Sequence, residues 1–241
     1  MNKKIWTTKW GAQIEAYFRI NKNDWNTHQS ILAEDEYFFN HLEGTIGIDI
    51  GAFIGSASLA MASKNMQVIA IEVLPENIEM INKNLQLNNF QDKVTILHRA
   101  INSDYTTIVK AFYGNPNTDG KNVHEFIGHT SQKLINDRFV EVQSISLNEI
   151  FTQYNLSHCD ILKIDCEGGE WPCFEAANND VLSKIHYIVG ELHTGQGEPR
   201  GSLTSFKSLL GDRFENKSLE FGFKPQPDTA LQGFIFVNRD W

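Results

Sequence analysis

The sequence predicts an α/β fold built on one mostly parallel sheet with helices on both faces. Three short apolar runs are typical of strands: residues 45–50, 67–72 and 94–98. Two helical patterns separate them: residues 56–63 and 75–88. This β-α-β-α-β alternation indicates parallel strands, which need crossover connections and are buried on both faces. The first strand meets a glycine-bearing turn, Asp49-Ile-Gly-Ala-Phe-Ile-Gly55, at which a helix begins.

Length and composition narrow the class of protein. A chain of 241 residues suits one α/β domain, so residues 1–241 are predicted to form a single domain. A net charge of −9 argues against a nucleic-acid partner, and no apolar stretch approaches the roughly 20 residues that a membrane helix needs. Three sparse cysteines (Cys159, Cys166 and Cys173) make a poor disulfide framework, which favours reduced thiols and a cytoplasmic location. Assembly of the chain into a homo-oligomer is compatible with these observations.

Residues 1–42 form a predicted entry segment. A hairpin from 5–8 and 16–20 precedes a helix that runs through His28 to Leu42, with Asp24 or Asn26 as its cap. Trp25 and His28 either shape the floor of a substrate pocket or serve as a hydrophobic staple and a solvated histidine, and the second interpretation is preferred. The tryptophans of this segment could stack on sugar rings or belong to the core: Trp6, Trp10 and Trp25.

The second half of the chain resumes the wound pattern after an interruption. Residues 106–113 resemble a strand, and the weakly patterned insertion at 102–137 is predicted to cover a substrate site. Further predicted strands are residues 139–144, 160–165 and 185–192, and further predicted helices are 147–154, 171–182 and 202–210. Residues 219–223 and 233–237 are predicted to pair as antiparallel strands at the sheet edge.

The glycine turn discriminates between two cofactors. A dinucleotide fingerprint needs glycine where this chain has Phe53 and Ser56, so a nicotinamide-dependent oxidoreductase is disfavoured. Asp49 would repel a pyrophosphate but suits a cationic cofactor such as S-adenosylmethionine. Glu72 ends the second strand, where a carboxylate can accept hydrogen bonds from ribose hydroxyls.

The sequence resembles the FkbM group of S-adenosylmethionine-dependent methyltransferases. The resemblance rests on Asp49–Gly55 with Glu72 and on the string Ile-Leu-Lys-Ile-Asp-Cys-Glu-Gly-Gly-Glu at 161–170, and it spans residues 45–192. It implies a class I methyltransferase fold: a Rossmann-like three-layer sandwich with strand order 3-2-1-4-5-7-6 and an antiparallel last strand. Phe53 departs from the group, which usually has asparagine there.

The resemblance also implies an activity and a cofactor site. Members mostly methylate hydroxyl groups of sugars, glycans or polyketides, so the expected acceptor is a small molecule or glycan. N-methylation of an amine or amide is the alternative, followed by a non-catalytic binding protein. The expected cofactor-binding residues are Asp49, Gly51, Ala52, Phe53, Ile54, Gly55, Ser56, Glu72, Val73, Asn77, Ala100, Ile101 and Asp165.

The chemistry is expected beyond the carboxyl ends of the fourth and fifth parallel strands. The candidate catalytic residues there are Asp165, Glu191 and His193. His193 is the preferred general base and Asp165 the second choice. In the alternative mechanism, Asp165 and Glu191 hold Mg²⁺, although metal-free catalysis is favoured. Lys163 is predicted to pair with Glu167 or Glu170, because an unpaired buried ammonium is costly.

Overall fold

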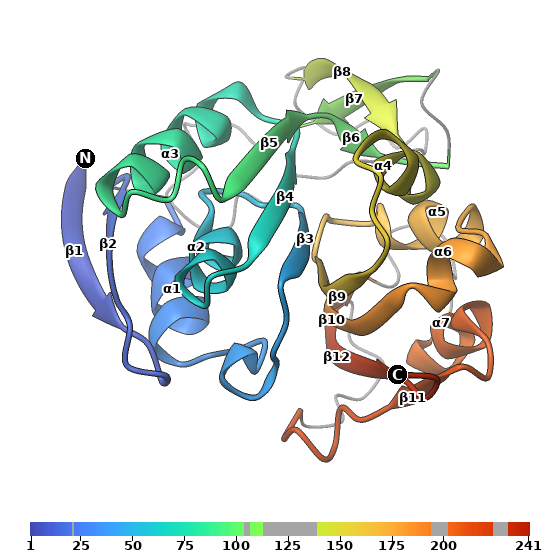
Figure 1. The fold of residues 1–241 in the computed structure, drawn as a ribbon. Coiled ribbons are helices and arrows are strands. Elements are labelled where there is room, and N and C mark those ends of the chain that lie inside the picture. The colour runs from blue at the N-terminus through green and yellow to red at the C-terminus, as the bar shows by residue number, and fades with distance from the viewer. Residues whose placement is uncertain (21, 104–106, 113–138, 194–201, 224–230) are drawn as a thin grey trace.

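A seven-stranded sheet runs through the protein, and helices cover both of its faces (Figure 1). The structure is a computed structural model that describes residues 1–20, 22–103, 107–112, 139–193, 202–223 and 231–241. The strands in spatial order are β5 (Val94–His98), β4 (Gln67–Glu72), β3 (Ile46–Ile50), β9 (Cys159–Ile164), β10 (Ile185–His193), β12 (Leu231–Asn238) and β11 (Phe214–Asn216). β12 is antiparallel to both neighbours, and the other pairs are parallel. The predicted three-layer, mostly parallel architecture is confirmed.

The strand order needs a correction of numbering. The predicted 3-2-1-4-5-7-6 is not the order of the strands as they are numbered along the whole chain, because further strands lie outside this sheet. β1 (Asn2–Thr7) and β2 (Gln13–Phe18) form a hairpin, while β6 (Ala100–Ile101), β8 (Phe139–Ile145) and β7 (Ile108–Phe112) form a second sheet. When the seven strands of the main sheet are numbered alone, from β3, they read 3-2-1-4-5-7-6.

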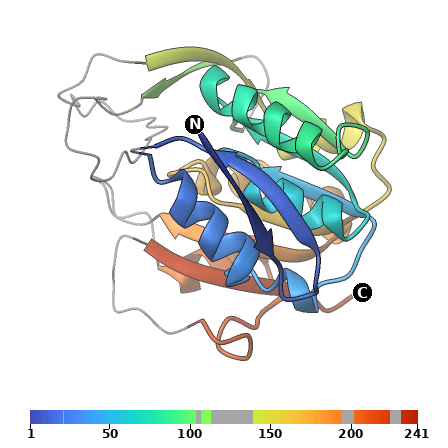
Figure 2. The ribbon, with the colours of Figure 1, turned by 90° about the vertical axis from the view of Figure 1, so that its left-hand side faces the viewer.

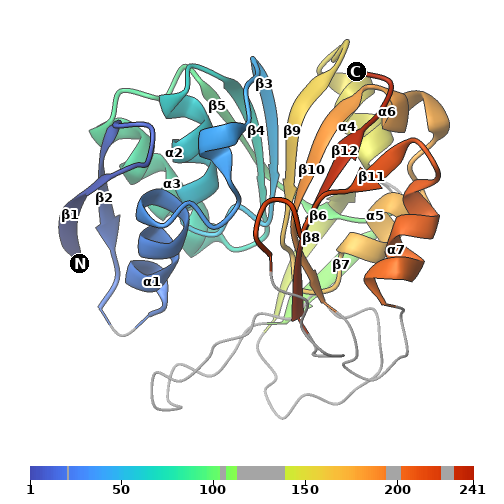
Figure 3. The same cartoon turned by 90° about the horizontal axis from the view of Figure 1, so that it is seen from below.

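Two helical layers bury the sheet between them (Figures 2 and 3). One layer contains α2 (Ser56–Ser63), α3 (Pro75–Leu87) and the N-terminal hairpin. The other contains α4 (Leu147–Gln153), α5 (Glu170–Glu175), α6 (Asn179–Ser183) and α7 (Leu203–Leu210). Side chains alternate across each strand, so Ile48 and Leu162 face the second layer while Ile161 and Val189 face the first. The polar residues that continue this alternation on the first face form the site described below.

The predicted helix from His28 to Leu42 is wrong beyond its first turns. The chain forms α1 (Asp24–His28), a π-helical turn η1 (Gln29–Ala33) and a 3₁₀ turn η2 (Phe39–His41). Asp35 and Phe38 both adopt left-handed backbone conformations, with φ of 59°, and these interrupt the helical hydrogen bonding. The Asp35 carboxylate accepts a hydrogen bond from the Asn40 amide at 3.1 Å, which stabilises the turn. This turn directs Tyr37 inward, toward the end of β9.

The preferred interpretation of His28 as a solvated residue is also wrong. Its side chain is fully buried against Trp6, with ring centroids 4.8 Å apart. Nε2 lies 3.1 Å from the Tyr17 carbonyl oxygen and Nδ1 lies 2.9 Å from Oγ of Ser56. Burial lowers the pKa of His28 to about 4, so the ring is neutral at pH 7. The neighbouring Trp25 stays 41% exposed, whereas Trp6 belongs to the core.

This buried histidine predicts acid sensitivity. Its pKa is lower in the folded state than in the unfolded chain, so the unfolded state takes up a proton first as the pH falls below about 6.5. The stability that the neutral ring contributes is therefore complete above that pH and is lost on acidification toward about 4, by about 3 kcal/mol. Urea unfolding at pH 7 and pH 4.5 should show a smaller acid loss in His28→Gln than in the wild type or in His98→Gln, which replaces an exposed histidine. Equal acid losses in all three proteins would refute the assignment.

Two further predictions are corrected. The helix expected at 171–182 is two helices, because Asn178 caps α6 by accepting a hydrogen bond from Val181 N at 2.8 Å. The edge partner of β12 is β11, and residues 219–222 form turns instead of the predicted strand. Most of the 102–137 insertion lies outside the described residues.

All three cysteines are free and buried, and within the described residues no helix is long and apolar enough to cross a bilayer.

Candidate functional site

The turn after β3 is held open by three left-handed residues. Gly51, Phe53 and Gly55 have φ of 75°, 51° and 89°. A Cβ on Gly51 would lie 1.9 Å from the Asp165 carbonyl oxygen, so glycine is required there for the ends of β3 and β9 to approach each other. Phe53 adopts a conformation that side chains other than glycine, asparagine and aspartate rarely occupy. The turn thus places its backbone directly beside the start of the segment that follows β9.

The backbone amides of this turn are already engaged. The Gly51 and Ala52 amides both donate to the Ile71 carbonyl oxygen at 3.0 Å. The Phe53 amide donates to Oε2 of Glu72 at 2.7 Å. A pyrophosphate cradle needs such amides to point at the ligand. The local hydrogen bonding therefore agrees with the absence of the dinucleotide fingerprint.

Glu72 is a buried acid at the end of β4, and it is 5% exposed. Its Oε1 accepts hydrogen bonds from the Leu74 amide at 2.8 Å and from Nδ2 of Asn77 at 3.2 Å. Burial raises the pKa of Glu72, and these hydrogen bonds act in the opposite direction. These hydrogen bonds fix the carboxylate between the glycine turn and the start of α3.

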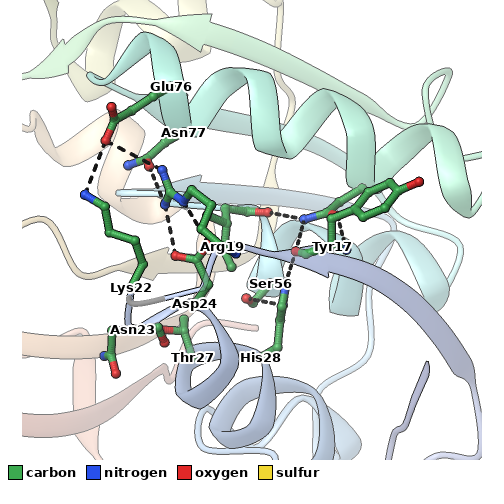
Figure 4. Close-up of polar contacts among 12 residues, drawn as sticks. Tyr17, Arg19, Lys22, Asn23, Asp24, Thr27, His28, Ser56, Glu76 and Asn77 are labelled. Atoms are coloured by element: carbon green, nitrogen blue, oxygen red, sulfur yellow. Dashed lines mark hydrogen bonds and ion pairs between the residues drawn. The ribbon is translucent and has the colours of Figure 1, made fainter. Parts of the chain in front are cut away.

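A polar network connects the entry segment to Asn77 at the start of α3 (Figure 4), and Asn77 in turn donates to Glu72. Arg19 donates through Nε to Oδ2 of Asp24 at 2.8 Å and through Nη2 to Oδ1 of Asn77 at 2.9 Å. Its guanidinium also lies over the Phe53 ring, 5.5 Å from the centroid. Asn77 therefore bridges Arg19 and Glu72, and the N-terminal segment supports the acid at the end of β4.

Lys163 joins the two halves of the site. This fully buried ammonium lies 3.3 Å from Oδ1 of Asp49 and 3.9 Å from Oδ2 of Asp165, and it donates to the Gly51 carbonyl oxygen at 2.9 Å. Burial acts to lower its pKa, but the two carboxylates outweigh that effect and the pKa is raised. The predicted partners, Glu167 and Glu170, are wrong: Lys163 pairs with Asp165 and with Asp49, whose Oδ2 accepts a hydrogen bond from the Ser58 hydroxyl at 2.6 Å.

Asp165, Glu191 and His193 meet beyond the ends of β9 and β10, and we call them the strand-end cluster. One ligand atom from each residue lies within 4.8 Å of the others, so together they could hold a metal ion. Glu191 and His193 are two positions apart on β10 and therefore point to the same face of the sheet. The three predicted catalytic residues are brought together on the face that also carries Asp49 and Lys163.

His193 is held as a cation in this cluster. Its Nδ1 is 3.0 Å from Oε1 of the fully buried Glu170, and its Nε2 is 3.3 Å from Oε2 of Glu167 and 4.0 Å from Oδ1 of Asp165. Burial opposes the charge, but these carboxylates raise the pKa of His193 to about 9. Glu170 also accepts hydrogen bonds from the Cys166 and Gly168 amides at 2.9 Å, which fixes the turn after β9.

Glu191 has the opposite character. Burial raises its pKa to about 8, and the neighbouring charges of Asp165 and Glu36 add to the rise, while His193 and Lys163 oppose it. A carboxyl group with such a pKa changes its protonation state near neutral pH. Glu191 is therefore the member of the strand-end cluster that can accept a proton under mild conditions.

The entry segment contributes two residues that sequence analysis missed. Tyr37 is buried, and its hydroxyl donates to Oδ2 of Asp165 at 2.9 Å. Glu36 is half-buried, and burial followed by the charge of Asp165 raises its pKa, although Ser30 donates a hydrogen bond to it. Both lie in the turn that replaces the predicted helix. No local pattern marks them, because only the folded chain brings residues 36 and 37 to the end of β9.

Several other predicted cofactor residues are buried. Ile54, Ala100 and Ile101 are at most 3% exposed. The Ser56 hydroxyl bonds His28, and the Val73 carbonyl oxygen accepts from Nε2 of His98 at 2.9 Å. Their roles in cofactor binding stay predictions.

Comparison with known proteins identifies a family of methyltransferases. The model of the family described as "Methyltransferase FkbM domain" matches residues 49–224. The methyltransferase sdnD of Sordaria araneosa is 25% identical over 189 residues, which cover 69% of this chain and 71% of that protein. The crystal structure of a putative rRNA-methylase from Clostridium thermocellum aligns at a TM-score of 0.49 and 11% identity, over 92% of this chain and 98% of its own. A putative O-methyltransferase from Klebsiella pneumoniae aligns at 0.45 and 13%, over 88% and 80%.

Proposed function

Because this chain belongs to the FkbM methyltransferase family, we propose that it transfers the methyl group of S-adenosylmethionine to a hydroxyl of a sugar, glycan or other small molecule. The observation that carries this proposal is the junction at Lys163, where Asp49 of the glycine turn and Asp165 of the strand-end cluster share one buried cation. A methyl donor bound at the turn and an acceptor bound at the cluster would then be neighbours, as a direct transfer requires.

Two acids support the cofactor half of the proposal. In this proposal Glu72 accepts hydrogen bonds from the ribose hydroxyls. The carboxylates of Asp49 and Asp165 outnumber the single Lys163 cation between them, which leaves negative charge near a cationic donor. S-adenosylmethionine supplies an activated methyl group on a positively charged sulfur. The engaged amides of Gly51, Ala52 and Phe53 speak against a pyrophosphate in this turn, and hence against a nicotinamide dinucleotide.

We assign the general base to Glu191. Sequence analysis favoured His193, but a ring held as a cation by Glu170 has no lone pair with which to take a proton. Glu191 has a pKa near 8, close to the range in which a general base works well. In the proposed reaction the acceptor oxygen bonds to the methyl carbon as the carbon–sulfur bond breaks, and the hydroxyl proton passes to the Glu191 carboxylate. His193 and Tyr37 then act as positioning residues that hold Asp165 in place.

We further propose that catalysis needs no divalent metal. Both nitrogens of His193 face carboxylates, and Asp165 already accepts from Tyr37, so two of the three candidate ligands have partners of their own. Turnover should therefore persist after treatment with excess EDTA and removal of the chelate. Complete loss of methyl transfer, with rescue by added Mg²⁺, would overturn this part of the proposal.

The acceptor atom distinguishes the proposal from its alternative. Labelled methyl groups from S-adenosylmethionine should reach oxygen in a glycan and metabolite panel, with the product identified by mass spectrometry. An N-methyltransferase would label an amine or amide, and that reaction should depend little on Glu191 because an amine needs less help from a base. Tight cofactor binding without transfer to any acceptor would instead favour a binding protein.

A further inference from the structure

Three phenylalanines form an aromatic cluster beside the strand-end cluster, and we call them the aromatic wall: Phe38, Phe221 and Phe223. The Phe38 ring lies 5.0 Å from the Phe223 ring and 5.7 Å from the Phe221 ring, measured between centroids, in edge-to-face arrangements. All three side chains are partly exposed, although each is large and apolar. Such rings usually pack out of solvent, so their position at the edge of a polar site needs an explanation.

The register of β10 and β12 places this wall next to Glu191. Glu191 pairs directly with Gly233 in the antiparallel ladder, and directly opposite residues project to the same face of a sheet. A Cβ on Gly233 would lie 2.5 Å from Cε1 of Phe223, so this ring fills the space that a side chain at position 233 would take. Phe223 therefore lies on the same face as Glu191, over the adjacent strand.

One residue of the aromatic wall belongs to the turn that contacts Asp165. Phe38 is the residue after Tyr37, whose hydroxyl bonds Asp165, and its left-handed backbone turns its ring toward Phe221 and Phe223. The wall thus borders the strand-end cluster on the β12 side, while the glycine turn borders it on the β3 side. A molecule whose hydroxyl reaches Glu191 would have its remaining atoms against these rings.

The charges around Glu191 restrict that molecule further. Besides Glu191 itself, three acids lie at this position among the described residues: Glu36 and Asp165, whose charges act on Glu191, and Glu167, which contacts His193. The two nearby cations are each held by buried acids, Lys163 by Asp49 and His193 by Glu170. A phosphate or carboxylate on the acceptor would add negative charge to an acidic, partly desolvated site, which is unfavourable.

We propose that the acceptor is a cyclic compound that carries no negative charge and stacks an apolar ring face on the aromatic wall. This inference rests on the proposed function, because it names the class of molecule that the methyl-accepting half of the site would take. The face of an aromatic ring carries partial negative charge, so it attracts C–H groups and cations. It also offers a flat apolar surface on which a ring compound can stack. Neutral and cationic ring compounds bind, and sugar phosphates, nucleotide-linked sugars and uronic acids do not.

Ligand-observed NMR on the full chain saturated with S-adenosylhomocysteine tests this directly. The probes are methyl β-glucoside, glucosamine, tyramine, glucuronate, glucose 6-phosphate and the acyclic control glycerol. We expect binding of the first three only. Phe223→Leu should weaken that binding about fivefold, because it removes the ring face and keeps an apolar side chain. Phe90→Leu, which alters a partly buried ring packed with Lys93 in the segment that follows α3, should leave it unchanged.

Each outcome bears on one of the two proposals. Failure to bind S-adenosylhomocysteine would contradict the proposed function itself. Binding of S-adenosylhomocysteine together with binding of glucose 6-phosphate or glucuronate would contradict only the acceptor class. The acceptor class is likewise overturned when the three expected rings fail to bind, or when they bind Phe223→Leu as well as the wild type.

Discussion

Glu191→Gln loses methyl transfer, with kcat lower by about 10²- to 10⁴-fold, the usual contribution of a general base. Glutamine keeps the size of the side chain and removes its capacity to take a proton. The pKa of Glu191 is about 8 because burial, Asp165 and Glu36 disfavour its charge, against His193 and Lys163. Steady-state assays with labelled S-adenosylmethionine measure the loss. Binding of S-adenosylhomocysteine should not change.

The same assignment predicts a pH profile. Below about pH 8 Glu191 binds a proton, so kcat falls about tenfold for each further unit of acidification. Glu175→Gln, which changes an exposed acid on α5, serves as the matched control and keeps the wild-type profile. A wild-type profile that is flat between about pH 6 and 8, or full activity in Glu191→Gln, would exclude Glu191 as the base.

Lys163→Met unfolds more readily than the wild type, by about 3–5 kcal/mol, because removal of one partner leaves buried charge without compensation. Lys163 is 3% exposed and lies between Asp49, which is fully buried, and Asp165. Methionine fills a similar volume but provides no positive charge. Urea unfolding at pH 7 measures the difference in the free energy of unfolding.

A second substitution separates charge from packing in this experiment. Asp49→Asn removes the carboxylate with which Lys163 forms an ion pair. The double variant Lys163→Met with Asp49→Asn should therefore lose less free energy of unfolding than the sum of the two single losses. The expected coupling is about 0.5–3 kcal/mol. Additive losses in the double variant, or a Lys163→Met protein as stable as the wild type, would show that the buried ion pair does not connect the two halves of the site.

The sheet and the helices that alternate with it could be predicted because their signals are local. β4, β5 and α2 have the predicted bounds, since short apolar strands that alternate with helical segments leave few other arrangements. The strand-end cluster was predictable for a related reason. The carboxyl ends of neighbouring parallel strands meet at one edge, so Asp165 and Glu191 had to be close.

The entry segment could not be predicted because distant contacts decide its structure. Residues 24–42 have an apolar face at helical spacing, yet the chain leaves the helix so that Tyr37 can bond Asp165, which is 128 positions away. His28 is a polar residue of a type that is often exposed, but here the hairpin packs over its side chain and buries it. Glu36 gains its role only from that turn. Its pKa depends on Asp165, which no local pattern in residues 24–42 indicates.

The cofactor site is tested most directly by calorimetric titration of the protein with S-adenosylhomocysteine and, separately, with NAD. We predict saturable binding of S-adenosylhomocysteine, about tenfold weaker in Glu72→Gln because a hydrogen bond to a charged acceptor is lost, and unchanged in Glu79→Gln, an exposed acid on α3. NAD should give no binding heat. Binding of NAD without binding of S-adenosylhomocysteine would contradict the account.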